Sequence, residues 1–229
     1  MADTVLIAGA SRGLGLGLAC EWLSRGWSVV GTVRGGAHTA LHDAAGTSGG
    51  RLTIEQLDIT DPASIAALRG RMAGRSLGVL FVNAGVASGG EDRVDHMETA
   101  EFSRIMETNA LGPLRVIEAL GPLVRPGGAI AAMSSSLGSV SLNESGGMEA
   151  YRASKAALNT LLRSYAVRHA RDGHTLALVH PGWVRTDMGG PGASLLVVDS
   201  VRGIVDALAT RMGQPGLQYF DYQGKTLPW

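Results

Sequence analysis

The alternation of short apolar runs with longer helical patterns most constrains how this chain of 229 residues can fold. The helical patterns cover residues 14–25, 62–73, 101–120, 149–171 and 195–211. Seven runs rich in β-branched residues predict strands at 4–9, 27–33, 52–58, 77–83, 128–134, 174–180 and 217–221. Most are continuously apolar, as expected for parallel strands buried on both faces. This order predicts an α/β fold: a doubly wound parallel sheet of about seven strands with helices on both faces.

Composition narrows the class of protein further. No boundary divides the pattern, so we expect residues 1–229 to form one domain. The net charge is zero and no basic block occurs, which argues against nucleic acid or an anionic membrane as a partner. A single cysteine, Cys20, allows no internal disulfide and favours a cytoplasmic location. We expect no signal peptide, no membrane span and no metal site, because the apolar runs are short and the six histidines lack ligand spacing.

A glycine-rich turn, "AGASRGLG", follows the first predicted strand and contains Gly9, Gly13 and Gly15. The turn opens a predicted helix, where free backbone N–H groups and the helix dipole can hold a pyrophosphate. Glycine suits this position because a Cβ atom would block the close approach of the phosphates. The spacing G-x-x-x-G-x-G also fits a plain turn between a strand and a helix, so this motif alone leaves both interpretations open.

The end of the second predicted strand, "GTVRGG", indicates which dinucleotide would bind. Folds that prefer NAD place an Asp or Glu there to bind the ribose 2′-hydroxyl, and this stretch has none. Arg34 lies there instead, and Arg12 lies inside the glycine turn. Two arginines near the adenosine ribose suit a 2′-phosphate and favour NADP(H) over NAD(H). Ordinary surface arginines are the alternative, because the chain has eighteen of them.

Tyr151 and Lys155 lie four residues apart on a predicted helix and therefore share a face. An ammonium beside a tyrosine hydroxyl favours the phenolate and lowers a pKa that is about 10 in water. Such a tyrosine can act as a general acid or base near neutral pH. Lys155 is one of only two lysines in this arginine-rich chain. A compact ammonium with three donors can face both the tyrosine and a cofactor ribose, which a guanidinium could not do as well.

These motifs together resemble the short-chain dehydrogenase/reductase family. "YRASK", "SSSLG" before it, the glycine turn, "NAG" at 83–85 and "PGWVRT" at 181–186 occur in the family's order over the full chain. Within the family, "GGMEAYRASKAALN", "HPGWVRTDMGG" and "FDYQGKTLPW" are similar to the C-factor and sniffer-type carbonyl reductases. The resemblance implies a Rossmann-type fold and an NAD(P)-dependent oxidoreductase.

The resemblance also implies catalytic roles for four residues. Tyr151 would exchange a proton with the substrate oxygen, while Lys155 lowers the tyrosine pKa and holds the nicotinamide ribose. Ser135 corresponds to the serine that orients the substrate. Asn109, in "ETNALG", corresponds to the asparagine that anchors a water molecule leading protons to the lysine.

The family's cofactor contacts carry over to a larger set of positions. Asp58 would meet the adenine ring, Asn83 the adenosine ribose, and Thr186 the nicotinamide or pyrophosphate side. Ala8 and Val82 depart from the family's usual Thr and Asn without touching the proposed chemistry. The full set of expected cofactor-binding residues is Gly9, Ser11, Arg12, Gly13, Leu14, Gly15, Arg34, Asp58, Ile59, Asn83, Ala84, Gly85, Tyr151, Lys155, Pro181, Gly182, Val184 and Thr186.

The expected function is NADPH-dependent reduction of a ketone or aldehyde by hydride transfer, with Tyr151 as the general acid. Two alternatives stay open: an NAD(P)-linked alcohol dehydrogenase that works oxidatively, and a dinucleotide-binding signalling protein of the C-factor type. The resemblance also implies a homodimer or homotetramer paired through the helices at 101–120 and 149–171. Met148, Trp183 and the tail at 220–229 either border the substrate pocket or only pack.

Overall fold

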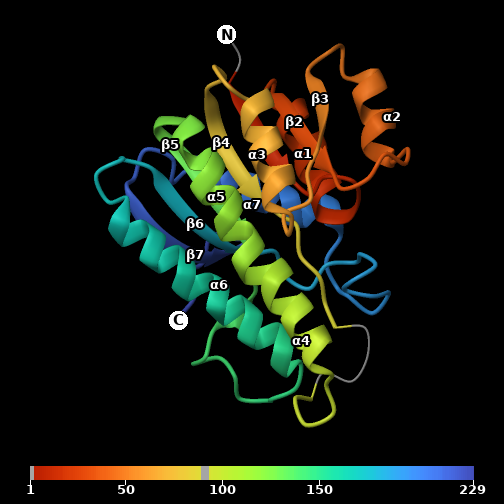
Figure 1. The fold of residues 1–229 in the computed structure, drawn as a ribbon, viewed down its shortest axis with the longest axis vertical. Helices are drawn as coiled ribbons and strands as arrows, with labels where there is room; N and C mark the ends of the chain where they lie inside the picture. The colour runs from red at the N-terminus through yellow and green to blue at the C-terminus, as the bar shows by residue number, and fades with distance from the viewer. Residues whose placement is uncertain (1–2, 89–92) are drawn as a thin grey trace.

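Seven parallel strands form one sheet in the computed structural model, which describes residues 3–88 and 93–229 (Figure 1). Their order across the sheet is β3-β2-β1-β4-β5-β6-β7, so the chain winds outward from β1 to one side and then, from β4, to the other. This arrangement confirms the predicted fold class. The strands are β1 (Thr4–Ala8), β2 (Ser28–Val33), β3 (Leu52–Gln56), β4 (Leu77–Val82), β5 (Val124–Met133), β6 (Thr175–His180) and β7 (Gly216–Asp221).

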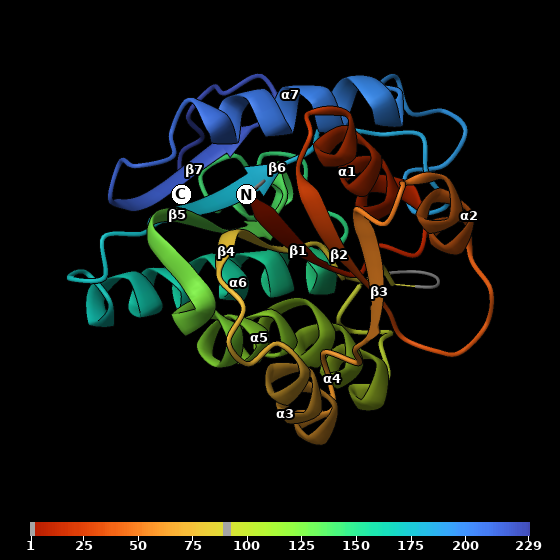
Figure 2. The ribbon, with the colours of Figure 1, turned by 90° about the horizontal axis from the view of Figure 1, so that it is seen from above.

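Helices cover both faces of the sheet (Figure 2). One layer contains α1 (Gly13–Ser24), α2 (Ala40–Thr47) and α7 (Val197–Ala209). The other contains α3 (Pro62–Arg71), α4 (Thr99–Met106), the π-helical turn η1 (Glu107–Leu111), α5 (Gly112–Leu120) and α6 (Glu149–Arg168). Two 3-10 turns, η2 (Gly121–Leu123) and η3 (Ser136–Gly138), flank β5. Within the described ranges, no helix combines the length and apolarity needed to cross a membrane.

Every strand except the edge strand β3 contributes side chains to two hydrophobic cores, one on each face of the sheet. Leu6, Leu80 and Ile130 pair in register across β1, β4 and β5, and all three face the core beneath α3, α5 and α6. Their neighbours Ile7 and Phe81 face the core beneath α1 and α7. Because successive residues point to opposite faces, burial on both sides requires the continuous apolar runs seen in the sequence.

The structure differs from the expected elements in three places. Helix α2 was not expected, because Leu41 is its only buried residue and gives no apolar periodicity. Strand β5 begins at Val124 rather than at 128, with an irregular register across its Pro-Gly-Gly segment, 126–128. The helix expected at 101–120 is interrupted by η1, a π turn that the apolar pattern does not reveal.

Candidate active site

A cleft of about 960 Å³ opens where the strands reach their carboxyl ends, around the point where the strand order reverses between β1 and β4. Crevices at this position of doubly wound sheets are the usual ligand sites. Most of the expected cofactor-binding residues line it: Gly9, Ser11, Arg12, Gly13, Leu14, Arg34, Asp58, Ile59, Asn83, Ala84, Gly85, Tyr151, Lys155, Pro181 and Thr186.

The glycine turn packs against the end of β4 so closely that side chains would not fit. Gly9 has φ +86°, and a Cβ atom on it would lie 2.8 Å from the Cβ of Ala84. A Cβ atom on Gly15 would lie 2.0 Å from the Gly9 carbonyl oxygen and 2.7 Å from Asn83 Nδ2. The backbone N–H of Gly9 donates to Thr32 Oγ1 at 2.9 Å, and Asn83 Nδ2 donates to the Gly9 carbonyl at 2.8 Å. These contacts fix the turn at the mouth of the cleft.

The turn fits a bound pyrophosphate. Arg12 occupies the N-cap position of α1, where its side chain makes no capping bond to any described residue and the first turn carries no acidic residue. The N–H groups of the first helical turn have no intrahelical acceptor. They therefore present donors and positive dipole charge to the cleft, as anion sites at helix N-termini do.

The lining of the cleft just after β2 and β3 carries the charged residues expected near an adenosine. Asp58 Oδ1 accepts hydrogen bonds from the Thr60 N–H at 2.9 Å and the Thr60 hydroxyl at 2.7 Å. These bonds, with a smaller contribution from the Arg34 charge, lower the pKa of Asp58 and keep it ionised. Arg34 is exposed at the cleft. Arg12 instead pairs with Asp187 at 2.7 Å, across the mouth of the cleft, an arrangement that the sequence did not indicate.

Tyr151 and Lys155 lie in the first two turns of α6 and are both buried, with 9% and 4% of their surface exposed. Lys155 Nζ donates to the Met133 carbonyl at 2.9 Å and lies 5.7 Å from the centroid of the Tyr151 ring. Burial lowers the pKa of Lys155 to about 8. Burial also raises the pKa of Tyr151 to about 12, and a hydrogen bond with Ser135 opposes that rise.

The expected lowering of the Tyr151 pKa by Lys155 is wrong for the described structure. Loss of hydration disfavours the phenolate more than the neighbouring groups favour it. The amine is itself desolvated, so its charge is also disfavoured. In the described structure, burial therefore favours the protonated phenol of Tyr151 and the uncharged amine of Lys155.

Asn109 is fully buried in the π turn η1, between Val86 and Ser154. Its Oδ1 accepts from the Val86 N–H at 2.8 Å, and its Nδ2 donates to the Val86 carbonyl at 2.8 Å and to Ser154 Oγ at 3.0 Å. A Cβ atom on Gly85 would lie 3.2 Å from Asn109 Oδ1 and 3.4 Å from Lys155 Nζ, so both groups flank that glycine. Single π turns are frequent at functional sites.

Five of the expected site residues are not among those that line the cleft: Gly15, Asn109, Ser135, Gly182 and Val184. Gly182 has φ +83° and sits against Leu195 and Tyr222, where a side chain would collide. Val184 is buried and pairs with Leu195 in an isolated bridge. The functional roles of all the site residues stay predictions.

Sequence reasoning missed several residues that line the cleft. Thr32 was a detectable one, since it is the polar residue of an otherwise apolar strand end and is 1% exposed. Met133 participates through its backbone carbonyl, which no sequence pattern reveals. Of the residues left open, Trp183 is 60% exposed and donates to the Gly189 carbonyl at 2.9 Å, while Met148 caps α6 with φ +50°.

Comparison with known proteins identifies the family. Residues 9–210 match the family model described as Enoyl-(Acyl carrier protein) reductase. A crystal structure described as a short-chain dehydrogenase/reductase from Burkholderia multivorans with bound NADP is 49% identical, with a TM-score of 0.98 and both chains fully covered. The chain belongs to the short-chain dehydrogenase/reductase family. It is an oxidoreductase that uses a nicotinamide dinucleotide and acts on small molecules.

The names of other relatives refer to different activities. A carbonyl reductase from Pseudomonas aeruginosa PAO1, solved in complex with NADP, is 37% identical with a TM-score of 0.93, and the match covers 100% of both chains. The C-signal of Myxococcus xanthus is 44% identical over 153 residues, covering 66% of this chain and 92% of that protein. The 1-hydroxy-2-glutathionyl-2-methyl-3-butene dehydrogenase of Rhodococcus sp. (strain AD45) is 35% identical over 189 residues, covering 81% and 80%.

Proposed function

We propose that the protein reduces a ketone or aldehyde to an alcohol with NADPH. The observation that carries the proposal is the placement of Tyr151 and Lys155, both buried, in the same cleft as the open N-terminus of α1. Ser135 adds a second hydroxyl, because it hydrogen-bonds with Tyr151. The similarity to the carbonyl reductase of Pseudomonas aeruginosa supports the substrate class.

The protonation states suit reduction. The bound cofactor would supply the hydride, and the protein would position the substrate and supply the proton. With a pKa of about 12, the Tyr151 phenol holds its proton at neutral pH and can give it to an oxygen that gains negative charge. Lys155, with a pKa of about 8, can return a proton to that region. Asn109 keeps the Val86 backbone in place beside them.

A panel of ketones and aldehydes, assayed with NADPH, tests the proposed reaction. We expect turnover of at least one carbonyl compound and a loss of roughly 10²–10⁴-fold in kcat for Tyr151→Phe, as for removal of a general acid. Tyr222→Phe, a half-buried tyrosine that does not line the cleft, is the control and should retain activity. Equal activity of Tyr151→Phe and wild type would refute the role of Tyr151.

We also propose that NADPH binds more tightly than NADH. Arg34 supports this preference, because it is exposed at the cleft beside Asp58 and no acidic residue occupies the end of β2. A charge-assisted contact is worth roughly 1.5–3 kcal/mol, so Arg34→Ala should weaken NADPH binding by about one to two decades and leave NADH binding unchanged. Arg75→Ala, an exposed arginine outside the cleft, is the control. Equal affinities of the wild type for both cofactors would contradict the preference.

Similarity to a specific relative supports each of two other functions. The Rhodococcus dehydrogenase favours an enzyme that oxidises an alcohol, and alcohols assayed with NADP⁺ and NAD⁺ would reveal it. The similarity to C-signal favours a signalling role, and an absence of turnover with every carbonyl and alcohol tested would favour that role instead. A cytoplasmic location and a single domain over residues 1–229 stay proposals.

A further inference from the structure

A tyrosine from the last strand reaches the backbone of Ser135. Tyr219, in β7, donates its hydroxyl hydrogen to the carbonyl oxygen of Ser135, which is 84 positions away in the sequence. The tyrosine is 2% exposed. A buried hydrogen bond of this kind is strengthened by the low local dielectric. The backbone of Ser135 is therefore tied directly to the far edge of the sheet.

Two further polar side chains complete a buried network around the same segment. Ser134 Oγ donates to Asn159 Oδ1 at 2.7 Å, and Asn159 Nδ2 donates to the Gly138 carbonyl at 3.2 Å. The side chains of Asn159 and Ser134 also lie near the Tyr219 hydroxyl, where they oppose the rise that burial causes in its pKa. Residues 134–138 are thus held at both ends, by α6 on one side and by β7 on the other.

The segment that follows is held by the same end of the chain. The rings of Tyr219 and Trp229 lie 5.4 Å apart. The backbone oxygen of Trp229 accepts hydrogen bonds from the Ser141 N–H at 3.2 Å and from the Ser141 hydroxyl at 2.7 Å. Ser141 is therefore bound to Trp229, in the tail at 220–229.

In this arrangement the carbonyl and the hydroxyl of Ser135 have different partners. Its carbonyl is held by Tyr219, while its hydroxyl accepts from the Leu137 N–H at 3.2 Å and hydrogen-bonds with Tyr151. A fixed backbone limits the hydroxyl oxygen to the few staggered rotamers of one side-chain torsion. A buried tyrosine needs some partner for its hydroxyl, but here the partner is the backbone of a residue that contacts Tyr151.

We propose that Tyr219, acting with Asn159, is a positioning residue that holds the Ser135 hydroxyl against Tyr151 and the substrate oxygen. The inference rests on the proposed function, because the position of the Ser135 hydroxyl affects the reaction only if Ser135 contacts the substrate. It goes further by assigning part of the active site to β7.

Amide hydrogen exchange measures how strongly Tyr219 restrains the segment around Ser135, and it requires no enzyme turnover. Tyr219→Phe removes one hydroxyl and keeps the ring, so amides in residues 134–142 should exchange about tenfold faster, the effect of losing one net hydrogen bond. Tyr165→Phe is the matched control: Tyr165 is also buried, at 1% exposed, and lies in α6 about 21 Å along the helix from Tyr151. Unchanged exchange of residues 134–142 in Tyr219→Phe would overturn the proposal. If that variant unfolds globally, Ser134→Ala, which removes another hydroxyl of the network, gives the same comparison.

A double-mutant cycle then measures the catalytic consequence. We expect Tyr219→Phe to lower kcat about tenfold with less than a twofold change in the NADPH Kd, because a small displacement of a reacting group is costly. In a Ser135→Ala background the same change should cost less than about twofold, since the group to be positioned is gone. Equal losses in both backgrounds would reduce Tyr219 to a packing role. Wild-type protein that turns over no carbonyl compound would defeat the proposed function, while the exchange experiment would still decide whether Tyr219 holds Ser135.

Discussion

At the residue scale, the surroundings of Lys155 explain why this position carries a lysine in an arginine-rich chain. Its Nζ is buried beneath the Met133 carbonyl. A Cβ atom on Gly138 would lie 2.9 Å from the Lys155 Cβ, and one on Gly85 would lie 3.4 Å from Nζ. Two glycines thus give the lysine its space. A planar guanidinium needs more room and spreads its charge over three nitrogens.

We therefore predict that Lys155→Arg loses at least about tenfold in kcat although it keeps the positive charge, because the misplaced group no longer supports proton transfer. The measurement is kcat at saturating NADPH, with the fold checked by circular dichroism. Lys225→Arg, at the other lysine, which is exposed, is the matched control and should behave as wild type. A folded Lys155→Arg protein with half the wild-type kcat would show that charge alone suffices.

The same burial predicts how stability changes with pH. Burial lowers the pKa of Lys155 to about 8 in the folded protein, below its ordinary value of 10.5. Between these values the unfolded chain binds more protons, so the folded state gains stability as pH rises. The gain is on the order of 3 kcal/mol at most. Tyr151 has the opposite effect, because its folded pKa is about 12, and stability falls between pH 10 and pH 12.

We therefore expect the free energy of unfolding, measured by urea denaturation, to rise from pH 8 to a maximum near pH 10 and then to fall. Lys155→Met should remove the rise and keep the fall. Lys225→Met should keep both, because that lysine is exposed. A Lys155→Met protein with the full wild-type rise would show that another group causes it.

At the scale of elements, the sequence predicted what depends on periodicity and missed what depends on contacts between distant segments. Most of the strands were predictable because burial on both faces demands long apolar runs, as in β4. Helix α2 buries only Leu41 and left no such pattern. The π turn that carries Asn109 shifts the helix by one residue, and hydrophobic periodicity does not resolve a single inserted residue.

In the candidate site, too, residues with a regular spacing were predictable, and contacts between distant segments were not. Tyr151 and Lys155 were found because both lie on one helix with a spacing of four residues. The partners of the site residues came from other elements: Lys155 bonds to the Met133 carbonyl of β5, and the Ser135 carbonyl accepts from the Tyr219 hydroxyl of β7. Every residue has a backbone carbonyl, so no residue type in the sequence marks which carbonyl will accept a bond. A tyrosine within an apolar strand cannot be distinguished in the sequence from an ordinary core residue.

The turn between β1 and α1 gives a prediction that separates packing from helix propensity. Gly15→Ala should abolish measurable NADPH binding and destabilise the protein, because its Cβ atom would lie 2.0 Å from the Gly9 carbonyl oxygen. Gly46→Ala, in α2, is the matched change in open space, and it should stabilise the protein by about 0.5–1 kcal/mol. Cofactor titration and thermal unfolding of both variants measure the contrast. Unimpaired binding by Gly15→Ala would mean that the turn relaxes without loss.

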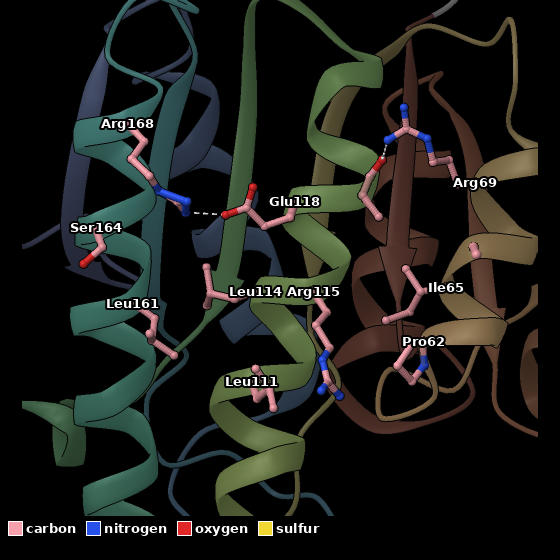
Figure 3. A pocket seen from close by; sticks show the side chains of 12 residues that line it. Pro62, Ile65, Arg69, Leu111, Leu114, Arg115, Glu118, Leu161, Ser164 and Arg168 are labelled. Atoms are coloured by element: carbon pink, nitrogen blue, oxygen red, sulfur yellow. Dashed lines mark hydrogen bonds and ion pairs between the residues drawn. The ribbon is translucent and has the colours of Figure 1, made fainter.

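At the scale of the whole molecule, an apolar groove of about 610 Å³ runs along the face formed by α3, α5 and α6. Figure 3 shows Leu114 and Leu161 in the space between α5 and α6, with Leu111 on the helix beside them and the ion pair of Glu118 and Arg168 above. Leu111 and Leu161 are 42% and 39% exposed. Large side chains left open on neighbouring helices favour burial against another surface.

We predict that this groove is the contact through which the chain forms the expected homodimer or homotetramer, since closed symmetric association presents the same patch from both subunits. Sedimentation at micromolar concentration should give two or four times the chain mass of 23.7 kDa. Leu161→Glu places a charge in the groove and should lower that mass, because a buried unpaired carboxylate is costly. Val198→Glu, a 48% exposed position on α7 on the opposite face of the sheet, is the control and should leave the mass unchanged. A wild-type mass of a single chain would refute the association, and an unchanged oligomer in Leu161→Glu would place the contact elsewhere on the molecule.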